Sequence, residues 1–272
     1  MKKILAVLLV AMMLFAFAAC GNTAAPAVDD GAGTEATESD LAYIMDKGVL
    51  VVGITDFEPM DYKDESGEWI GFDADVAKAF AESLGVAVEF VEIDWDNKIA
   101  ELNSKTIDCV WNGMTLTDEV TSSMDCSNAY CNNQQIVIVP ADKAEQYNSV
   151  EACKDLTFAV EAGSAGQAQA EENGFNYTEV KDQASALMEV ASGTSDAAII
   201  DSLMAAAMVG EGTGYAQLTY TVGLNDEEYG VGFRQGSDLV EKLNAFFQSA
   251  YADGSLMKFA ETYKVQAALI EQ

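Results

Sequence analysis

Histidine is absent from the 272-residue chain, and arginine occurs once, at Arg234. The lack of histidine excludes Ser-His and Cys-His nucleophile pairs, histidine metal sites and the commonest general base. Basic residues are few: 14 lysines and arginines stand against 45 acids, for a formal net charge of −31. Because nucleic acid binding depends on basic patches, DNA and RNA are excluded as partners, and the body of the chain is unsuited to anionic lipid surfaces.

Cysteine is also scarce, with Cys109, Cys126, Cys131 and Cys153 following Cys20. No C-x-x-C pair occurs, so we expect no zinc site, and the sequence indicates no other metal or cofactor. Four cysteines in an exported chain allow two disulfides. However, Cys109 lies in the strand-like segment IDCVW and Cys153 in VEACKDL, where buried free thiols fit equally well. The sequence leaves both states open.

The N-terminus carries export signals. MKK followed by the apolar run ILAVLLVAMMLFAFAA predicts a secretory signal peptide over residues 1–19; a membrane-spanning helix, the alternative, needs about 20 apolar residues. The FAAC ending resembles a bacterial lipoprotein cleavage box, although Phe17 stands where that box usually has Leu. The resemblance implies a lipid on Cys20, and so an extracytoplasmic protein anchored to the cell membrane. Residues 20–40 have almost no large apolar side chains, and we expect a flexible tether there.

Short apolar β-rich runs alternate with amphipathic helical segments along the rest of the chain. GVLVVGI predicts a buried strand, and GFDADVAKAFAESLG predicts a helix whose apolar residues recur every four positions. This alternation indicates βαβ units in an α/β fold. Because QQIVIVP and YTVGL interrupt the pattern, we expect two lobes joined by two crossings: residues 41–138, 139–222 and 223–272, the last returning to the first lobe through two helices broken at Asp253-Gly254. A single large sheet is the alternative.

A series of segments in a fixed order resembles one known family. They are GVLVVGITDFEPMDY, GEWIGFDADVAKAFAESLG, IDCVWNGMTLTDE, SNAYCNNQQIVIV, FAVEAGSAG, SDAAIID, EYGVGFRQGSDL and YADGSLMKFAETYK. From about Leu41 to Lys264, the chain resembles the extracytoplasmic solute-binding proteins that supply polar amino acids to ABC importers. The resemblance implies a two-lobed, periplasmic-binding-protein-like type II fold with two hinge crossings, acting as a monomer that docks on a membrane permease. Its lobes close over a ligand at the carboxyl ends of strands.

The resemblance also implies which residues contact the ligand. Phe57 and Trp95 cover two faces of its side chain, segment 112–115 hydrogen-bonds its amine and carboxylate, and Asp201 pairs with its α-ammonium group. The turn 163–166 presents backbone N–H groups to the carboxylate. The full predicted ligand-binding set is Phe57, Trp95, Asn112, Gly113, Thr115, Glu161, Ser164, Ala165, Gly166 and Asp201, with Glu161 at a position that the family varies with its ligand.

Structural roles are the alternative for several of these residues. Phe57 and Trp95 fit the core as well as a pocket, although Phe57 lies in a polar loop between two acids, which favours the pocket. Trp111 is one residue before the polar segment and should face the core, and Tyr130 fits hinge packing and a pocket wall equally. Asp201 ends the apolar strand AAII, where a carboxylate that caps the next helix is the alternative.

The chain departs from the family pattern at Val120. The family has an arginine there, whose guanidinium group binds the ligand's α-carboxylate through two parallel hydrogen bonds. The one arginine, Arg234, falls in a loop that the family places far from the ligand. Removing one partner of a buried ion pair costs about 2–5 kcal/mol, so a carboxylate ligand needs other support.

Two accounts of the missing arginine remain open. In the first, backbone N–H groups at the helix starts near Thr117 and Ala165 bind the carboxylate unaided. In the second, the ligand lacks an α-carboxylate, and Asp56, Glu161 and Asp201 surround a cation flanked by the two aromatic residues.

The function that follows is capture of a small amino acid or amine-bearing solute for an ABC importer, without catalysis. An enzyme of the same fold is one rival, with Glu161 and Asp201 as an acid–base pair. A ligand-sensing or adhesion module is the other; we expect a sensor to continue into a membrane helix and a signalling domain. The segment DYKDESGEW resembles a calcium loop but lacks its D-x-D-x-D-G spacing, so a solvated hairpin turn is favoured.

Overall fold

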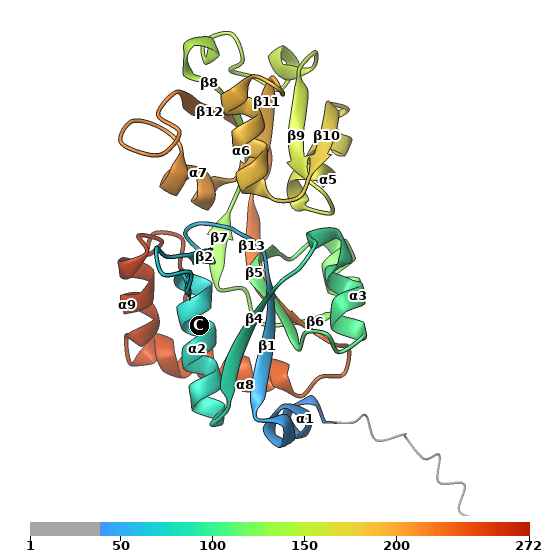
Figure 1. The fold of residues 1–272 in the computed structure, drawn as a ribbon, viewed down its shortest axis with the longest axis vertical. Helices are drawn as coiled ribbons and strands as arrows, with labels where there is room; N and C mark the ends of the chain where they lie inside the picture. Colours follow the sequence, from blue (N-terminus) through green and yellow to red (C-terminus); the bar gives the residue numbers. More distant parts are fainter. Residues whose placement is uncertain (1–38) are drawn as a thin grey trace, which may run out of the picture. The chain divides into compact units, whose positions relative to one another are not determined.

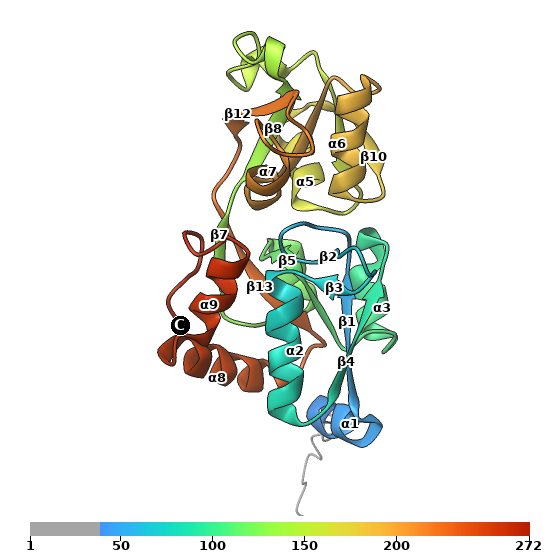
Figure 2. The same ribbon diagram turned by 60° about the vertical axis from the view of Figure 1, so that its left-hand side comes forward.

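The computed structural model describes residues 39–272; the predicted signal peptide, Cys20 and nearly all of the predicted tether lie outside them. The described residues form two α/β lobes, each built on its own sheet (Figures 1 and 2). The first lobe comprises residues 39–134 and 225–272, and the second lobe comprises residues 135–224. The alternative of a single large sheet is therefore wrong.

The sheet of the first lobe has the strand order β4, β1, β5, β13 and β6, and β7 also pairs with β13. The strands are β1 (Val49–Ile54), β4 (Ala87–Glu92), β5 (Cys109–Thr115), β6 (Asp125–Cys126), β7 (Cys131–Asn133) and β13 (Glu227–Phe233). β1 is parallel to β4 and β5, whereas β13 is antiparallel to β5, β6 and β7. The parallel strands bring their carboxyl ends to one edge, as expected for βαβ units.

Helices cover both faces of this sheet: α1 (Asp40–Lys47), α2 (Phe72–Leu84), α3 (Lys98–Asn103), α4 (Asp118–Ser123), α8 (Leu239–Ala252) and α9 (Ser255–Thr262). On α2, Phe72, Val76 and Phe80 recur every four residues and are all buried, which is the helical period of a core-facing stripe. Figures 1 and 2 show that α8 and α9 lie beside α2 on one side of the sheet, whereas α3 lies on the other side. Gly254, in a left-handed conformation, separates α8 from α9 as predicted.

A short hairpin formed by β2 (Tyr62–Lys63) and β3 (Trp69–Ile70) contains the segment DYKDESGEW. The Asp64 carboxylate accepts hydrogen bonds from the backbone N–H groups of Ser66 and Glu68, at 2.8 and 3.0 Å. Asp64 therefore stabilises a solvated hairpin turn, as the sequence favoured.

The second lobe has the strand order β10, β9, β11, β8 and β12. Its strands are β8 (Gln135–Pro140), β9 (Thr157–Glu161), β10 (Asn176–Val180), β11 (Ala197–Asp201) and β12 (Leu218–Gly223), and its helices are α5 (Ala165–Asn173), α6 (Gln183–Ser192) and α7 (Ser202–Met208). α5 and α6 contribute to different hydrophobic clusters, through Ala170 and through Leu187 respectively, so they cover opposite faces of the sheet. β9 and β11 are parallel and end at Glu161 and Asp201.

Two adjacent segments carry the chain between the lobes. Gln134 separates β7 from β8, and residues 224–226 separate β12 from β13. The segments are hydrogen-bonded to each other, because Leu224 N–H donates to Gln135 O at 2.9 Å and Gln135 N–H donates to Asn225 Oδ1 at 2.8 Å. The predicted crossing QQIVIVP is thus mostly strand β8, and the crossing itself lies at its first residue.

Packing in the first lobe decides the roles of Trp111 and Tyr130. Trp111 is buried and meets Phe247 edge to face at 5.8 Å, so it faces the core as predicted. Tyr130 is also buried against Phe247, and its hydroxyl donates to Asp73 Oδ2 at 2.7 Å. Tyr130 therefore packs inside the lobe rather than forming a pocket wall.

The four cysteines of the described chain are free thiols, and Cys109, Cys131 and Cys153 are buried. Burial raises the pKa of each of these thiols, which lowers the fraction of reactive thiolate. Among residues 39–272, no helix has the length and apolar character required to cross a membrane.

Candidate ligand-binding site

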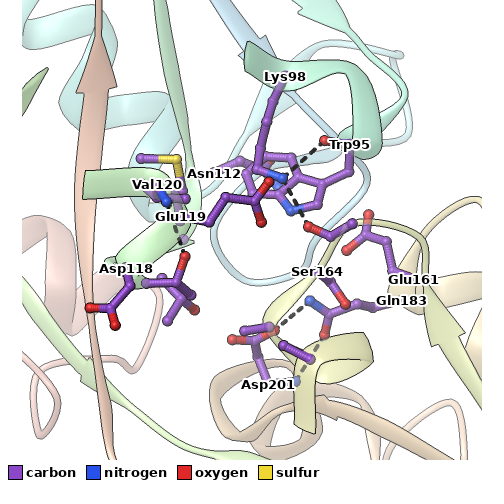
Figure 3. Close-up of a pocket in the computed structure, with 17 residues that line it drawn as sticks. Trp95, Lys98, Asn112, Asp118, Glu119, Val120, Glu161, Ser164, Gln183 and Asp201 are labelled. Atoms are coloured by element: carbon purple, nitrogen blue, oxygen red, sulfur yellow. Dashed lines mark hydrogen bonds between the residues drawn. The ribbon is translucent and has the colours of Figure 1, made fainter. Parts of the chain in front are cut away.

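A cavity of about 260 Å³ lies where the carboxyl ends of β5, β9 and β11 approach the starts of α4 and α5. Both lobes line it, as Figure 3 shows. The predicted site residues that line it are Trp95, Asn112, Gly113, Thr115, Glu161, Ser164, Ala165 and Asp201. Two predicted residues, Phe57 and Gly166, are not among its lining residues.

Asp201 is the last residue of β11, and its buried carboxylate accepts hydrogen bonds from four side chains. Oδ1 accepts from Tyr229 Oη at 2.6 Å, from Gln135 Nε2 at 3.0 Å and from Asn133 Nδ2, whereas Oδ2 accepts from Gln183 Nε2 alone. Burial raises the pKa of Asp201 to about 7. Because a carboxylate oxygen accepts about two hydrogen bonds, Oδ2 is the atom with capacity for a ligand donor. The Asp201 side chain makes no capping bond to α7, so the helix-cap alternative is wrong.

Glu161 is the last residue of β9 and is 3% exposed. Its Oε1 atom has no hydrogen-bond partner, and burial, followed by repulsion from Asp201, raises the pKa of Glu161 to about 8. A buried carboxyl group without a full set of donors is costly unless a proton or a cation neutralises it. Asp56, which one account placed around a cation, does not line the cavity.

The polar groups of β5 are largely engaged within the first lobe. The Asn112 side chain pairs with Thr55, accepting from its N–H and donating to its Oγ1, both at 2.9 Å. Gly113 N–H donates to Asp73 Oδ2 at 2.6 Å. A Cβ atom on Gly113 would lie 2.5 Å from the Phe57 ring, at a backbone φ of 55°. Only glycine fits there, so this wall of the cavity is formed by backbone.

The start of α5 forms the opposite wall. Ser164 is its N-cap, because the Ser164 hydroxyl accepts from Gln167 N–H at 3.1 Å. The first N–H groups of a helix have no acceptor within the helix, so those of Ala165 and Gly166 can donate hydrogen bonds to an anion. Gly166 itself packs against β11: a Cβ atom there would lie 3.0 Å from Ile199 O.

The two predicted aromatic residues have different surroundings. Trp95 is in the short 3₁₀ helix η1 (Trp95–Asn97), lines the cavity and is 7% exposed. Phe57 is 2% exposed and packs edge to face on Tyr229 at 6.3 Å, behind Gly113. Phe57 therefore supports the glycine wall from within the first lobe.

Val120, which replaces the expected arginine, is buried on α4 and lines the cavity. Arg234 is remote from the cavity lining and is bound by the first lobe: its guanidinium Nη2 lies 2.9 Å from Asp40 Oδ1, and its Nη1 donates to Ile107 O at 2.9 Å. The one arginine therefore has a structural role.

Lys98 and Gln183 also line the cavity (Figure 3), and the sequence analysis did not select them. Lys98 Nζ donates to Gly163 O at 2.8 Å, which joins the lobes, and lies 5.1 Å from the centre of the Trp95 ring. The spacing of Trp95 and Lys98, three residues apart at a helix start, is the signal that indicates their proximity. Gln183 has no such signal, because its role follows from tertiary contact with Asp201.

Residues 50–266 match the family of bacterial extracellular solute-binding proteins, family 3. The chain belongs to this family.

Individual proteins show the same relationship. The chain is similar to the arginine-binding extracellular protein ArtP of Bacillus subtilis (strain 168), with 30% identity over 270 residues, covering 97% of this chain and 98% of that protein. It is 30% identical over 268 residues to the L-cystine-binding protein TcyA of the same organism, covering 97% of each. The solved structure of an ancestral amino acid-binding protein, AncCDT-1, a precursor of cyclohexadienyl dehydratase, superimposes with a TM-score of 0.76 at 33% identity, covering 83% of this chain and 99% of that one.

These comparisons confirm the predicted resemblance. The chain is a bacterial extracellular solute-binding protein of family 3 with the two-lobed α/β fold, and the relatives named above are amino-acid-binding proteins. The family description places such proteins outside the cytoplasm.

Proposed function

We propose that this protein captures a small amino acid or amine-bearing solute between its lobes and delivers it to a membrane permease. The observation that supports the proposal is a single cavity with complementary walls. Trp95 of the first lobe offers an apolar ring, whereas Glu161 and Asp201 of the second lobe offer buried carboxyl groups. An ammonium group bound between these walls contacts both lobes at once.

Capture works by a shift between open and closed arrangements of the lobes. The two crossing segments at Gln134 and residues 224–226 are short and mutually hydrogen-bonded, so they act together as a hinge. A ligand favours the closed arrangement only through contacts that it loses when the lobes separate. The permease then recognises the closed form and receives the solute.

The test is calorimetric titration of the chain from residue 39 onward with a panel of amino acids and amines. Asp201→Asn keeps the shape of the side chain but removes its charge, so we expect its affinity for the best ligand to fall at least about 30-fold, equivalent to about 2 kcal/mol. Asp155→Asn, at an exposed site of the second lobe, is the matched control. Wild-type protein that binds nothing in the panel would rule the proposal out.

Attachment to the membrane is part of the same proposal. Cys20 follows a predicted signal peptide and would carry the lipid that keeps the binding protein near its permease. We expect Cys20→Ala to release the protein from the membrane fraction without changing its ligand affinity; persistence of the variant in that fraction would contradict the role of Cys20.

A lyase is the second candidate, favoured by one feature of the cavity. Burial raises the pKa of Glu161 to about 8, so at neutral pH the group holds a proton that it can donate to a leaving group. Turnover of a bound ligand, followed by mass spectrometry and abolished by Glu161→Gln, would establish catalysis. A ligand that is unchanged after prolonged incubation would show that the protein binds it without turnover.

A further inference from the structure

Lys98 is a buried cation without an anionic partner. It is 5% exposed, and its ammonium group donates to two backbone carbonyls, Gly163 O at 2.8 Å and Trp95 O at 3.3 Å. No ion pair within residues 39–272 includes Lys98, whereas the other buried cation, Arg234, is paired with Asp40. An ammonium group has three N–H donors, so one donor of Lys98 remains for a group in the cavity.

The same cavity contains a buried carboxyl group with an oxygen that also lacks a partner. Glu161 Oε1 has no hydrogen-bond donor, although the residue is 3% exposed. Burial lowers the pKa of Lys98, and the nearby acids Glu119, Glu161 and Asp96 oppose that shift, but none of them forms an ion pair with Lys98. A cavity with an unpaired cation on the first lobe and an unpaired acid on the second lobe is complementary to a molecule that carries both charges.

The surroundings of Lys98 favour an oxyanion next to its ammonium group. Gly163 O, its acceptor, directly precedes the N-cap of α5. The first turn of α5 therefore begins close to this acceptor, and its free N–H groups and the Lys98 ammonium both favour negative charge in the cavity. Val120 offers no charge there.

We propose that Lys98 takes the place of the arginine missing at Val120 and binds the carboxylate of the ligand, while Glu161 and Asp201 bind its ammonium group. This inference rests on the proposed function of solute capture. It assigns the ligand to molecules with both a free carboxylate and a free ammonium group, namely intact amino acids, and makes Lys98 the residue that distinguishes them from amines. An amine without a carboxylate leaves the Lys98 charge buried and unpaired.

The experiment compares three amino acids with their decarboxylated counterparts by calorimetry: arginine with agmatine, lysine with cadaverine, and histidine with histamine. We expect wild-type protein to prefer the amino acid of the pair that it binds best. In Lys98→Met the affinity for that amino acid falls at least about 30-fold, whereas the affinity for the amine changes less than about threefold. Lys98→Arg keeps the charge and retains the preference.

Lys181→Met is the matched control, because Lys181 also joins the lobes, through an ion pair with Glu92, but does not line the cavity. If Lys98 acts only as a link between lobes, both lysine variants weaken the amino acid and the amine alike, and that result overturns the inference. Equal affinity of wild-type protein for the amino acid and the amine also overturns the inference. This test needs no variant, so it remains decisive even if Lys98→Met does not fold. If wild-type protein binds an amine but no amino acid, the inference fails while solute capture stands; if it binds neither, both fail.

Discussion

Buried carboxyl groups are the residues whose behaviour depends most on pH. Burial raises the pKa of Glu161 to about 8 and the pKa values of Asp73 and Asp201 to about 7. Burial, followed by repulsion from Asp73, raises the pKa of Asp61 well above its usual range, and both Asp61 oxygens lack a hydrogen-bond partner. Near pH 6 the folded protein therefore holds protons that the unfolded chain releases.

We predict that the unliganded protein loses stability as the pH rises. A pKa raised above its unfolded value means that the stabilising proton is fully bound below the unfolded pKa, 4.5 for a glutamate, and is lost as the pH rises through about 8. The free energy of unfolding should fall by up to about 1.4 kcal/mol per pH unit for each such group. Urea denaturation at pH 5.5, 7.0 and 8.5 measures this slope.

Glu161→Gln cannot ionise and should therefore flatten the pH dependence. Glu241→Gln, at an exposed site on α8, is the matched control and should leave the slope as in wild type. A Glu161→Gln slope equal to that of wild type would mean that Glu161 is ionised in the folded protein.

At the scale of elements, Arg234 joins three parts of the first lobe. Its guanidinium group binds Asp40 at the start of α1 and lies 3.5 Å from Asp108 before β5. It also donates hydrogen bonds to Leu102 O on α3 and to Ile107 O. Asp40 and Asp108 are both buried. Arg234 is the cation paired with Asp40, whereas Asp108 lies closer to Lys47 Nζ, at 2.6 Å.

We predict that Arg234→Met lowers the free energy of unfolding by about 3–5 kcal/mol, since it leaves the buried Asp40 without its cation. Lys242→Met, at an exposed site on α8, should change it by less than about 0.5 kcal/mol. Because Arg234 does not line the cavity, ligand affinity of the folded Arg234→Met protein should match wild type. Chemical denaturation and calorimetry measure the two effects separately, and a loss of affinity without a loss of stability would place Arg234 in the binding site.

At the scale of the whole molecule, contacts between the lobes are concentrated in a few places. Lys181 pairs with Glu92, and Lys98 donates to Gly163 O. The backbone of Gly163 also approaches the other lobe closely: a Cβ atom there would lie 2.7 Å from Asp96 Cα, at a φ of 70°. A side chain at this position therefore keeps the lobes from reaching their present separation.

We predict that Gly163→Ala weakens ligand binding at least about tenfold, because closure is obstructed. Gly174→Ala is the matched control: Gly174 has a φ of 67° and open space around it, so it carries the same backbone penalty of about 1–2 kcal/mol without a contact between lobes. Both variants should lose similar stability, and only Gly163→Ala should lose affinity. Small-angle scattering should show that ligand compacts wild type and Gly174→Ala but not Gly163→Ala; equal compaction of all three would contradict the prediction.

The sequence alone determined the α/β class, the order of the two lobes and much of the cavity. Strand and helix periods are local, so strands over residues 107–114, 156–163 and 195–201 could be located from neighbouring residues. The resemblance to the family then placed the ligand at their carboxyl ends. The absence of arginine at Val120 was equally visible in the sequence.

Only the tertiary structure decided which side chains face the cavity and what neutralises them. Phe57 lies behind Gly113, in the core, and its ring is so close to the β5 backbone that only glycine fits at position 113. Lys98 meets Gly163 across 65 positions of sequence, and Oε1 of Glu161 is buried without a hydrogen-bond donor. Burial and unpaired charge depend on contacts between segments distant in the chain, and local patterns contain no record of those contacts.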